Sequence, residues 1–356
     1  VHTAVSLALL SGVFLLILGQ FVAHPILLLM GAPKDIIHLA TLYLRIYFLG
    51  MPFFMLYDFG ASILRSIGDT RRPMYALIVS GVVNVILNLL FVVVFHMGVA
   101  GAGLATVGAN ATSAVQILYF LTHEELPIRL SFKSLTIDHD AVSKILKIGV
   151  PAGLQGMVFS LANVCIQSGI NSFGAGGIAG SAVELNYEYF AYYLVNAFAQ
   201  TVVTFTGQNY GAGKPERIWM GVKVSALMMI IYWAFTFCVL MLGARTFALL
   251  FVEASELEIL KDTELFLHIS VSFFPVLGLL CILRYTIQGA GYTNLAMLSG
   301  VSEMIARVLV SLYAVPAFGY LAVCFGDPTA WIAAVLFLVP AFIFVYRRLL
   351  RMRREQ

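Results

Sequence analysis

Charged residues are scarce in this sequence: they make up 11% of its 356 residues, whereas hydrophobic residues make up 61%. Soluble domains carry about 25% charged and roughly 45–50% apolar residues, so the composition excludes a soluble enzyme. The mean hydropathy of +0.94 over the whole length shows that the apolar residues are not gathered into one anchor. Most of the chain must therefore lie in lipid, and we predict a polytopic membrane protein.

Cysteine is also rare. The four cysteines lie far apart inside apolar runs, so they predict neither a disulfide framework nor a CxxC metal or redox site. The net charge of +3 is modest, and the basic residues form no periodic face, which argues against a nucleic-acid partner. Residues 1–30 have no basic start and no cleavage site, so they are not typical of a signal peptide, and we expect Val1 to lie within a longer protein.

Ten apolar stretches of about 20 residues each predict ten transmembrane helices in an all-α fold. Clusters of Lys and Arg fall on alternate connections and on the tail, and basic connections face the cytoplasm. We therefore predict a multi-pass membrane protein with a cytoplasmic C-terminus. The centres of the ten stretches lie near Leu15, Gly50, Val85, Gly108, Ser160, Val195, Met229, Pro275, Val308 and Leu336.

The longest polar stretch predicts a division into two helical bundles. It runs from His123 to Asp140 and is interpreted as a cytoplasmic linker over residues 123–142. Four predicted helices precede it in residues 1–122, the remainder of an N-terminal lobe. Six follow it in the C-terminal lobe, residues 143–346, and a basic tail covers residues 347–356.

A parallel internal repeat supports the two bundles. Both copies run from an outside loop through a proline-broken helix to a cytoplasmic G-x-T turn, and they share one orientation in the membrane. Because four predicted spans precede the linker and six follow it, we expect two further helices before Val1. At one constant offset along the chain, Leu42, Leu44, Ile46, Pro52, Leu56, Gly68 and Thr70 match Leu265, Leu267, Ile269, Pro275, Leu279, Gly291 and Thr293.

Five motifs in this order resemble the multidrug and toxic-compound extrusion (MATE) transporters, within the wider group that includes lipid-linked oligosaccharide flippases. Each motif alone is a glycine-rich segment of low specificity, but the resemblance that they form together covers nearly the whole chain. They are ILRSIGDTRRPM at 63–74, GVAGAGLAT at 98–106, KIGVPAGLQ at 147–155, TFTGQNYGAGKPERI at 204–218 and QGAGYTNLAMLSGVSEMIAR at 288–307.

The resemblance implies a protein of the bacterial inner membrane with twelve helices in two six-helix lobes and both termini inside, of which helices three to twelve are present here. It implies secondary active transport, in which a sodium or proton gradient drives the export of bulky, often cationic compounds through a cavity between the lobes. The partners implied are the lipid bilayer and small cationic molecules, and the protein is expected to be a monomer. No cofactor is expected besides the coupling ion, and no metal site besides a sodium site. Many members place a coupling acid in the first helix, which this sequence lacks.

Ionisable residues at membrane depth are functional candidates because a charge there is costly unless it faces a cavity or a partner. Glu188 is interpreted as a carboxylate that binds the coupling ion or a cationic substrate, with a structural hydrogen bond as the alternative. Glu184, one turn earlier, fits a solvated rim residue better. Tyr187 is the aromatic residue that we expect beside Glu188 for an organic cation. Glu303 and Arg307, four residues apart, predict an ion pair within one helix, although a role of Glu303 in proton or substrate binding stays open.

Asp58 and Arg284 are candidates for a gate, because they occupy repeat-related helices near the same depth. Pro52, Pro151 and Pro275 are expected to interrupt helices, either as hinges or as static kinks. Six amides within predicted helices form a polar stripe that lines the cavity, with hydrogen bonds between helices as the alternative for any single one. They are Asn84, Asn88, Gln155, Asn163, Gln167 and Asn171.

Two other functions compete with drug export. A flippase for a lipid-linked oligosaccharide would concentrate Arg and Lys around a pyrophosphate, whereas the deep basic residues here are few. An intramembrane enzyme would need a clustered nucleophile, an acid-base pair or a metal set. The seven histidines are scattered, so we predict that the protein is not an enzyme.

Overall fold

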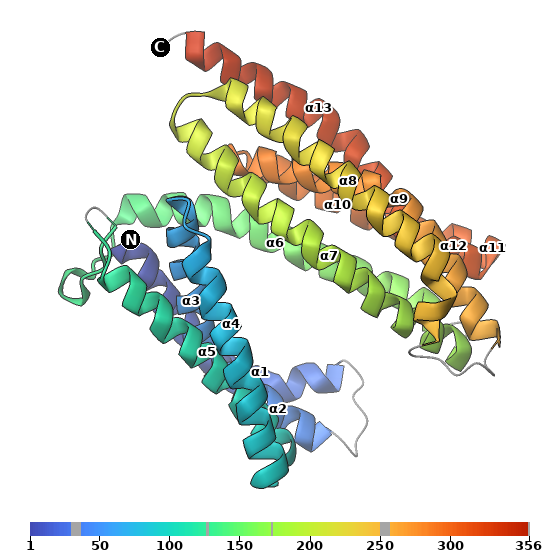
Figure 1. The fold of residues 1–356 in the computed structure, drawn as a ribbon, viewed down its shortest axis with the longest axis horizontal. Coiled ribbons are helices and arrows are strands. Elements are labelled where there is room, and N and C mark those ends of the chain that lie inside the picture. The colour runs from blue at the N-terminus through green and yellow to red at the C-terminus, as the bar shows by residue number, and fades with distance from the viewer. Residues whose placement is uncertain (30–36, 126–127, 172–173, 250–256, 355–356) are drawn as a thin grey trace. The chain divides into compact units, whose positions relative to one another are not determined.

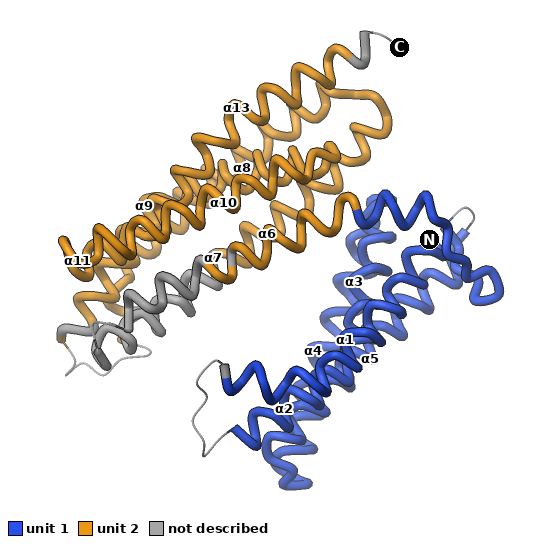
Figure 2. The backbone as a smooth tube through the Cα atoms, turned by 180° about the vertical axis from the view of Figure 1, so that it is seen from behind, with its two compact units in different colours: residues 1–146 blue, residues 147–356 orange. Residues whose placement is uncertain are grey.

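The computed structural model describes residues 1–29, 37–125, 128–171, 174–249 and 257–354. Within these ranges only the backbone is described for residues 29, 159, 162–171, 174–191, 247–248, 258–259 and 352–354. The described residues are almost entirely helical and contain no strand. Clustering of contacts divides the chain into two compact units, residues 1–146 and 147–356 (Figure 2).

Unit 1 is built around the packing of α1 and α5 against α3 (Figure 1). Its core is formed by apolar side chains of these three helices, among them Val5, Leu64 and Ile117. The helices are α1 (His2–Leu29), α2 (Ile37–Leu49), α3 (Met51–Ser66), α4 (Arg71–Asn88) and α5 (Gly98–Thr122), with a π-helical turn at Leu89–Val94 and a 3₁₀ turn at Phe132–Ser134.

Unit 2 is organised around α9, which packs against α7, α8, α10 and α13. Gly289 allows the close approach of α7, because a Cβ atom there would lie 2.8 Å from the carbonyl oxygen of Val203. The helix α6 begins in unit 1 and continues into unit 2. The helices are α6 (His139–Asn171), α7 (Gly174–Gly211), α8 (Pro215–Ala248), α9 (Leu257–Gly289), α10 (Thr293–Leu309), α11 (Val315–Phe318), α12 (Tyr320–Cys324) and α13 (Gly326–Arg354), with a π-helical turn at Val310–Ala314.

The helices confirm an all-α polytopic membrane protein. Among the described residues, seven helices are long and apolar enough to cross a membrane, or eight when the bent pair α2–α3 is taken as one span. Two further predicted centres, Ser160 and Val195, lie in α6 and α7, which have 33 and 38 residues. All ten predicted centres therefore lie within a helix or, for Gly50, at the bend between α2 and α3.

The two G-x-T turns of the predicted repeat have the same backbone structure. After α3, the Gly68 amide donates to Arg65 and the Asp69 amide to Leu64. After α9, the amides of Gly291 and Tyr292 donate to Gln288 and Ile287, which are the equivalent positions of the second copy. Both turns are Schellman motifs, in which the glycine must adopt a left-handed conformation. The φ angles of the two glycines, +91° and +87°, confirm the repeat at the level of the backbone.

The repeat continues beyond these turns. In each unit the helix after the turn, α4 or α10, ends in a π-helical turn, and a glycine with positive φ follows within a few residues, Gly98 in unit 1 and Gly319 in unit 2. The next long helix is α5 in unit 1 and α13 in unit 2. The pairs α4–α5 and α10–α13 are in contact, so each unit repeats the same arrangement.

The prolines act differently from one another. Pro52 lies in the first turn of α3, where a missing amide costs little, and α2 and α3 meet there at 45°. This confirms the predicted break. Pro151 and Pro275 end no helix, because α6 and α9 each continue through their proline, and a hinge or static kink at either one stays a prediction. A single lost hydrogen bond is tolerated inside a long helix whose neighbours pack around it.

The Gly291→Ala variant is expected to lower stability by about 1–2 kcal/mol, because an L-residue is strained in the left-handed region. The variant Gly81→Ala is the matched control: Gly81 lies inside α4 with nothing within 4 Å of its Cβ position, so it is expected to be neutral or to stabilise by up to about 1 kcal/mol. Thermal unfolding of the purified protein in detergent compares the two. Equal midpoints for both variants would contradict the role of the turn.

Candidate functional site

Four charged side chains from α9, α10 and α13 form one connected set inside unit 2. They are Arg284, Glu303, Arg307 and Asp327, and we call them the ion-pair chain. Three are almost fully buried: Arg284 is 7% exposed, and Glu303 and Arg307 are each 2% exposed. Two positive charges balance two negative ones, so the set is neutral as a whole.

Glu303 lies at the centre of the ion-pair chain. Arg284 donates to Glu303 Oε1 through Nη2 and to Ser299 Oγ through Nε, the latter at 2.9 Å. On the other side, Arg307 Nη1 lies 3.9 Å from Glu303 Oε2. Arg307 also binds Asp327 Oδ1, through Nε at 2.9 Å and Nη2 at 2.7 Å. Each arginine therefore has a second oxygen partner besides Glu303.

The helix period explains why these groups meet. Ser299, Glu303 and Arg307 recur every four residues and share one face of α10, which is the face buried against α9 and α13. Asp327 is the second residue of α13, where the positive end of the helix dipole favours a carboxylate. The buried residues of that α10 face are Thr293, Ala296, Ser299, Gly300, Glu303, Ala306 and Arg307.

The geometry fits a structural clamp better than a reactive centre. A buried ion loses its hydration, and only partners at short range compensate. Here both arginines are satisfied by carboxylates from other helices, so the ion-pair chain fixes α9, α10 and α13 relative to one another. No group of three or more His, Cys, Asp or Glu side chains that could hold a metal ion occurs in the described part of the chain.

The structure refines the predicted pairs. The Glu303–Arg307 pair within α10 is present, but each member has a closer partner on another helix. Arg284, predicted as a gate residue opposite Asp58, is instead buried against Glu303 and Ser299 within unit 2. Asp58 is half-buried in α3. Asp327 was missed in the sequence, although an acid at the start of the last apolar stretch was a usable signal.

A second charged cluster lies in unit 1, outside the apolar spans. Arg72 binds both Asp69 in the α3–α4 turn and Glu124 just after α5. Asp69 Oδ1 also accepts from the backbone amides of Arg71 and Arg72 at 3.0 and 3.2 Å. Partial burial would raise the pKa of Asp69, but these hydrogen bonds and the Arg72 charge outweigh it and lower that pKa. The cluster ties the turn to the end of α5.

The predicted amide stripe is resolved in part. Asn88 Nδ2 donates to Asn84, to its backbone oxygen at 2.9 Å and to Oδ1 at 3.1 Å. This bond lies within one helix, so it replaces the helix-to-helix bond considered as the alternative. Gln155 is half-buried in α6, and a Cβ atom on Gly300 of α10 would lie 3.1 Å from its Cγ. Gln155 therefore packs on α10.

The remaining candidates lie on α6 and α7, but their side chains are outside the described residues. Their backbones are helical, so the four-residue spacing of the α6 amides puts them on one face. Glu188 lies roughly four helical turns after Gly174, the first residue of α7. The candidates concerned are Asn163, Gln167, Asn171, Glu184, Tyr187 and Glu188.

Comparison with known proteins places the chain in a family. The profile of the family described as MatE matches residues 1–90 and 151–313, which is more than half of the chain and lies on both units. The chain belongs to the MatE family. Three members of the ion-pair chain, Arg284, Glu303 and Arg307, lie within the matched residues.

Relatives and solved structures agree with MatE membership. The chain is 26% identical to "Probable multidrug resistance protein YoeA" of Bacillus subtilis, over 98% of this chain and 77% of YoeA. It is 24% identical to "Multidrug export protein MepA" of Staphylococcus saprophyticus, over 82% of this chain and 65% of MepA. A MOP superfamily transporter from Pyrococcus furiosus has a similar fold, with a TM-score of 0.87 and 21% identity over 97% of this chain and 77% of that one.

MatE membership settles the broad class of the protein. It is a multi-pass membrane transporter and not an enzyme, as the sequence predicts. The chain spans 77% of the length of YoeA and 65% of that of MepA. The names of these relatives therefore do not establish which compounds this chain transports, which ion it is coupled to or which partners it has.

The Glu303→Gln variant is expected to lose about 3–5 kcal/mol of stability, because it leaves buried arginine charge without its carboxylate. The control Glu125→Gln removes an exposed carboxylate of unit 1 and is expected to change stability by less than about 0.5 kcal/mol. The double variant Arg284→Met/Glu303→Leu removes a whole pair and is expected to be more stable than Glu303→Leu alone. Thermal midpoints in detergent check this, and a Glu303→Gln protein as stable as the control would contradict the clamp.

Stability is expected to fall in acid through Asp69. The pKa of Asp69 in the folded protein lies below its ordinary value of 3.8, so its contribution is complete above that value and is lost as the pH falls through the lowered one. The thermal midpoint of the wild type is expected to exceed that of Asp69→Asn near neutral pH, and the difference is expected to shrink below about pH 4. A difference that grows as the pH falls would contradict this assignment.

Proposed function

We propose that this MatE chain is a secondary active exporter that moves organic cations and amphipathic compounds out of the cell in exchange for sodium ions or protons. The observation that carries the proposal is the MatE match on both units, residues 1–90 and 151–313. The names of YoeA and MepA, a probable multidrug resistance protein and a multidrug export protein, support the class of substrate.

The buried charges favour a cationic substrate over a lipid pyrophosphate. A pyrophosphate site needs arginine or lysine side chains that can bind phosphate oxygens. The buried arginines of the described residues, Arg284 and Arg307, are both bound to carboxylates. This observation supports drug export against the flippase function.

Alternating access is supported by the internal repeat. Each unit contains the same helix, Schellman turn, helix and π-helical turn in the same order. Parallel repeats of this kind move largely as rigid bodies around a shared site. The ion-pair chain would keep α9, α10 and α13 together during such a motion, and the Asp69–Arg72–Glu124 cluster would do the same for α3, α4 and α5.

Glu188 remains our first choice for the coupling carboxylate. Its place on α7, roughly four turns from the first residue, puts it about 21 Å from the start of that helix, deep in the span. A coupling acid must exchange a proton or sodium ion as access changes, which needs a carboxylate that is not permanently neutralised by arginine. Glu303 lies between two arginines and therefore fits this role less well.

The proposed orientation places the C-terminus in the cytoplasm. In unit 2, the α7–α8 turn and the end of α13 lie at the same end of the bundle (Figure 1). Lys214 and Arg217 lie at that turn, Lys223 follows within α8, and Arg347 and Arg348 lie near the end of α13. Basic residues mark the cytoplasmic side of a membrane protein, so this end supports the inward assignment.

The proposal is tested by transport. The chain is reconstituted in liposomes, and movement of a fluorescent organic cation is followed under an imposed sodium or proton gradient. One gradient is expected to drive transport, and Glu188→Gln is expected to abolish it because the variant cannot exchange the coupling ion. Glu125→Gln, which removes an exposed carboxylate, is the control and is expected to transport at the rate of the wild type.

Two results would count against this function. Transport that proceeds equally without any gradient would exclude coupling. A folded protein that moves no organic cation under either gradient would favour the flippase function, and a fluorescent lipid-linked sugar would then be the next substrate. Thermal unfolding of each variant separates loss of transport from loss of folding.

A further inference from the structure

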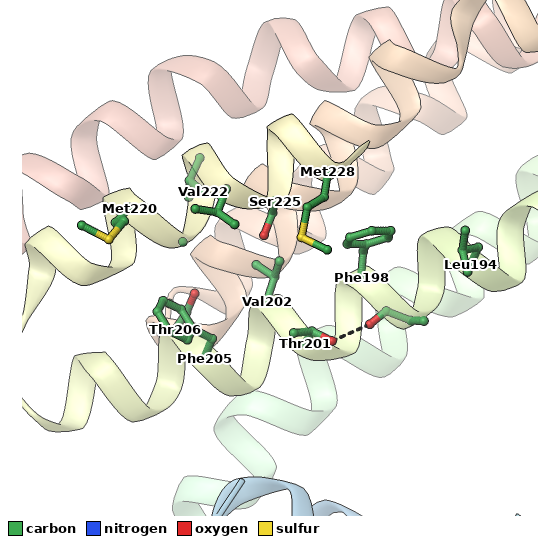
Figure 3. Close-up of a pocket in the computed structure, with 13 residues that line it drawn as sticks. Leu194, Phe198, Thr201, Val202, Phe205, Thr206, Met220, Val222, Ser225 and Met228 are labelled. Carbon is green, nitrogen blue, oxygen red and sulfur yellow. Dashed lines mark hydrogen bonds between the residues drawn. The ribbon is translucent and has the colours of Figure 1, made fainter. Parts of the chain in front are cut away.

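A groove of about 520 Å³ lies between α7 and α8 in unit 2 (Figure 3). Side chains of α7, including Phe198, Val202 and Phe205, form one wall, and α8 forms the other with residues such as Met220 and Met228. None of the 13 lining residues is charged. The groove therefore suits an apolar ligand.

The hydroxyl groups of the groove do not make it a polar site. Thr201 Oγ1 donates to the carbonyl oxygen of Ala197 at 2.9 Å, so it is satisfied within its own helix (Figure 3). Gly221 lies directly against the ring of Phe205, since a Cβ atom there would be 2.6 Å from that ring. The absence of a side chain at Gly221 thus lets Phe205 pack flat against α8 and shapes the groove.

Basic residues lie at one end of the groove. Arg217 precedes Gly221 by four residues and Val224 by seven, so it lies on the groove-lining face of α8. It stands about one turn before Met220, the first residue of α8 that lines the groove. It is exposed, as is Lys214 in the adjoining turn. A ligand with an apolar chain in the groove would bring an anionic group to these two side chains.

Aromatic residues mark the same level as the membrane interface. Trp219 stacks on Phe342 and lies beside Tyr346 of α13, and Lys223 Nζ lies 5.3 Å above the Trp219 ring. Trp and Tyr with adjacent basic residues are typical of the headgroup region of a bilayer. On α8 the groove begins at Met220, beside this belt, and continues to Met228, away from the basic turn.

The length of the groove matches one leaflet. Along α8 it extends from Met220 to Met228, a rise of about 12 Å. Half of the hydrocarbon core of a bilayer is about 15 Å thick. The groove therefore occupies the depth that the acyl chain of a phospholipid fills in the leaflet on the basic side.

We propose that the α7–α8 groove is a binding site for an anionic phospholipid of the cytoplasmic leaflet, with one acyl chain between α7 and α8 and its phosphate on Arg217 and Lys214. Charge complementarity and depth favour this ligand over a transported cation, since no lining residue is a carboxylate and the end of the groove carries two basic residues, Lys214 and Arg217, beside one acid, Glu216. The exposed apolar surface of α8 beyond it, with Leu227, Ile231 and Phe235, continues into surrounding lipid.

The experiment measures binding of phosphatidylglycerol with palmitoyl and oleoyl chains to the purified chain in detergent, by native mass spectrometry, with phosphatidylcholine of the same chains as the reference. The wild type is expected to retain phosphatidylglycerol in preference to phosphatidylcholine. Arg217→Gln is expected to weaken phosphatidylglycerol binding about fivefold, since one basic residue near an anionic surface has an effect of that size. Arg347→Gln, which removes an exposed arginine of α13, is expected to leave it unchanged.

Variants that fill the groove separate the acyl chain from the phosphate. Ala197→Phe fills it from α7 and is expected to abolish retention of both phospholipids at this site. Ala234→Phe makes the same change on the exposed part of α8 outside the groove and is expected to have no effect. Ser225→Phe, which fills the groove from α8, serves in place of Ala197→Phe if that variant does not fold.

The proposal is overturned if both groove-filling variants retain phosphatidylglycerol as the wild type does, or if Arg217→Gln and Arg347→Gln bind it equally. It is also overturned if a fluorescent organic cation displaces phosphatidylglycerol from the wild type and binds the wild type more tightly than it binds Ala197→Phe, since the groove would then belong to the transported compound. Because this experiment measures lipid binding and not transport, a failure of the lipid-site proposal can be told apart from a failure of the proposed drug export.

Discussion

A charge or a backbone polar group in hydrocarbon must find its partner inside the protein, since no water is available to bind it. The helices satisfy the backbone, and the ion-pair chain satisfies the charges. Arg284 and Arg307 would each be costly alone at the depth they occupy. Together with Glu303 and Asp327 they form a neutral set, and the packing of α9 with α10 and α13 depends on it.

The same turn recurs after three long helices, α3, α7 and α9, where the chain reverses direction. The amides of Asp69, Lys214 and Tyr292 each donate to the carbonyl five residues earlier, and the glycine before each has a positive φ. A Schellman turn ends a helix with its last carbonyls satisfied, so the reversal needs no long loop at the membrane surface. Short turns hold adjacent helices together, which suits the rigid-body motion that we propose for the units.

Apolar runs and glycine turns were predictable because they depend on local rules. Every predicted centre lies in a helix or at the α2–α3 bend, and the repeat matched by Gly68 and Gly291 extends to the hydrogen bonds. Partners across helices were not predictable, since the helix period fixes only neighbours within one helix. Glu303 was therefore paired with Arg307, and Asp327, which lies on a different helix, was missed. The prolines show the same limit, because the sequence does not show which helices pack around a proline. Pro275 fits inside α9 because the neighbouring helices support that helix.

The division between structural and coupling charges follows from their surroundings. A carboxylate that drives transport must be nearly as stable neutral as charged, so that a change of access can shift it. Glu303 is paired with two arginines from two directions, Arg284 of α9 and Arg307 of α10. Any motion that separated it from both would leave two buried charges, Glu303 and Arg284, without a partner of opposite charge. Arg307 would keep Asp327. The proposed coupling carboxylate is therefore better sought on a helix outside the ion-pair chain, and α7, which packs along α9 and carries Glu188, is one helix that meets this condition.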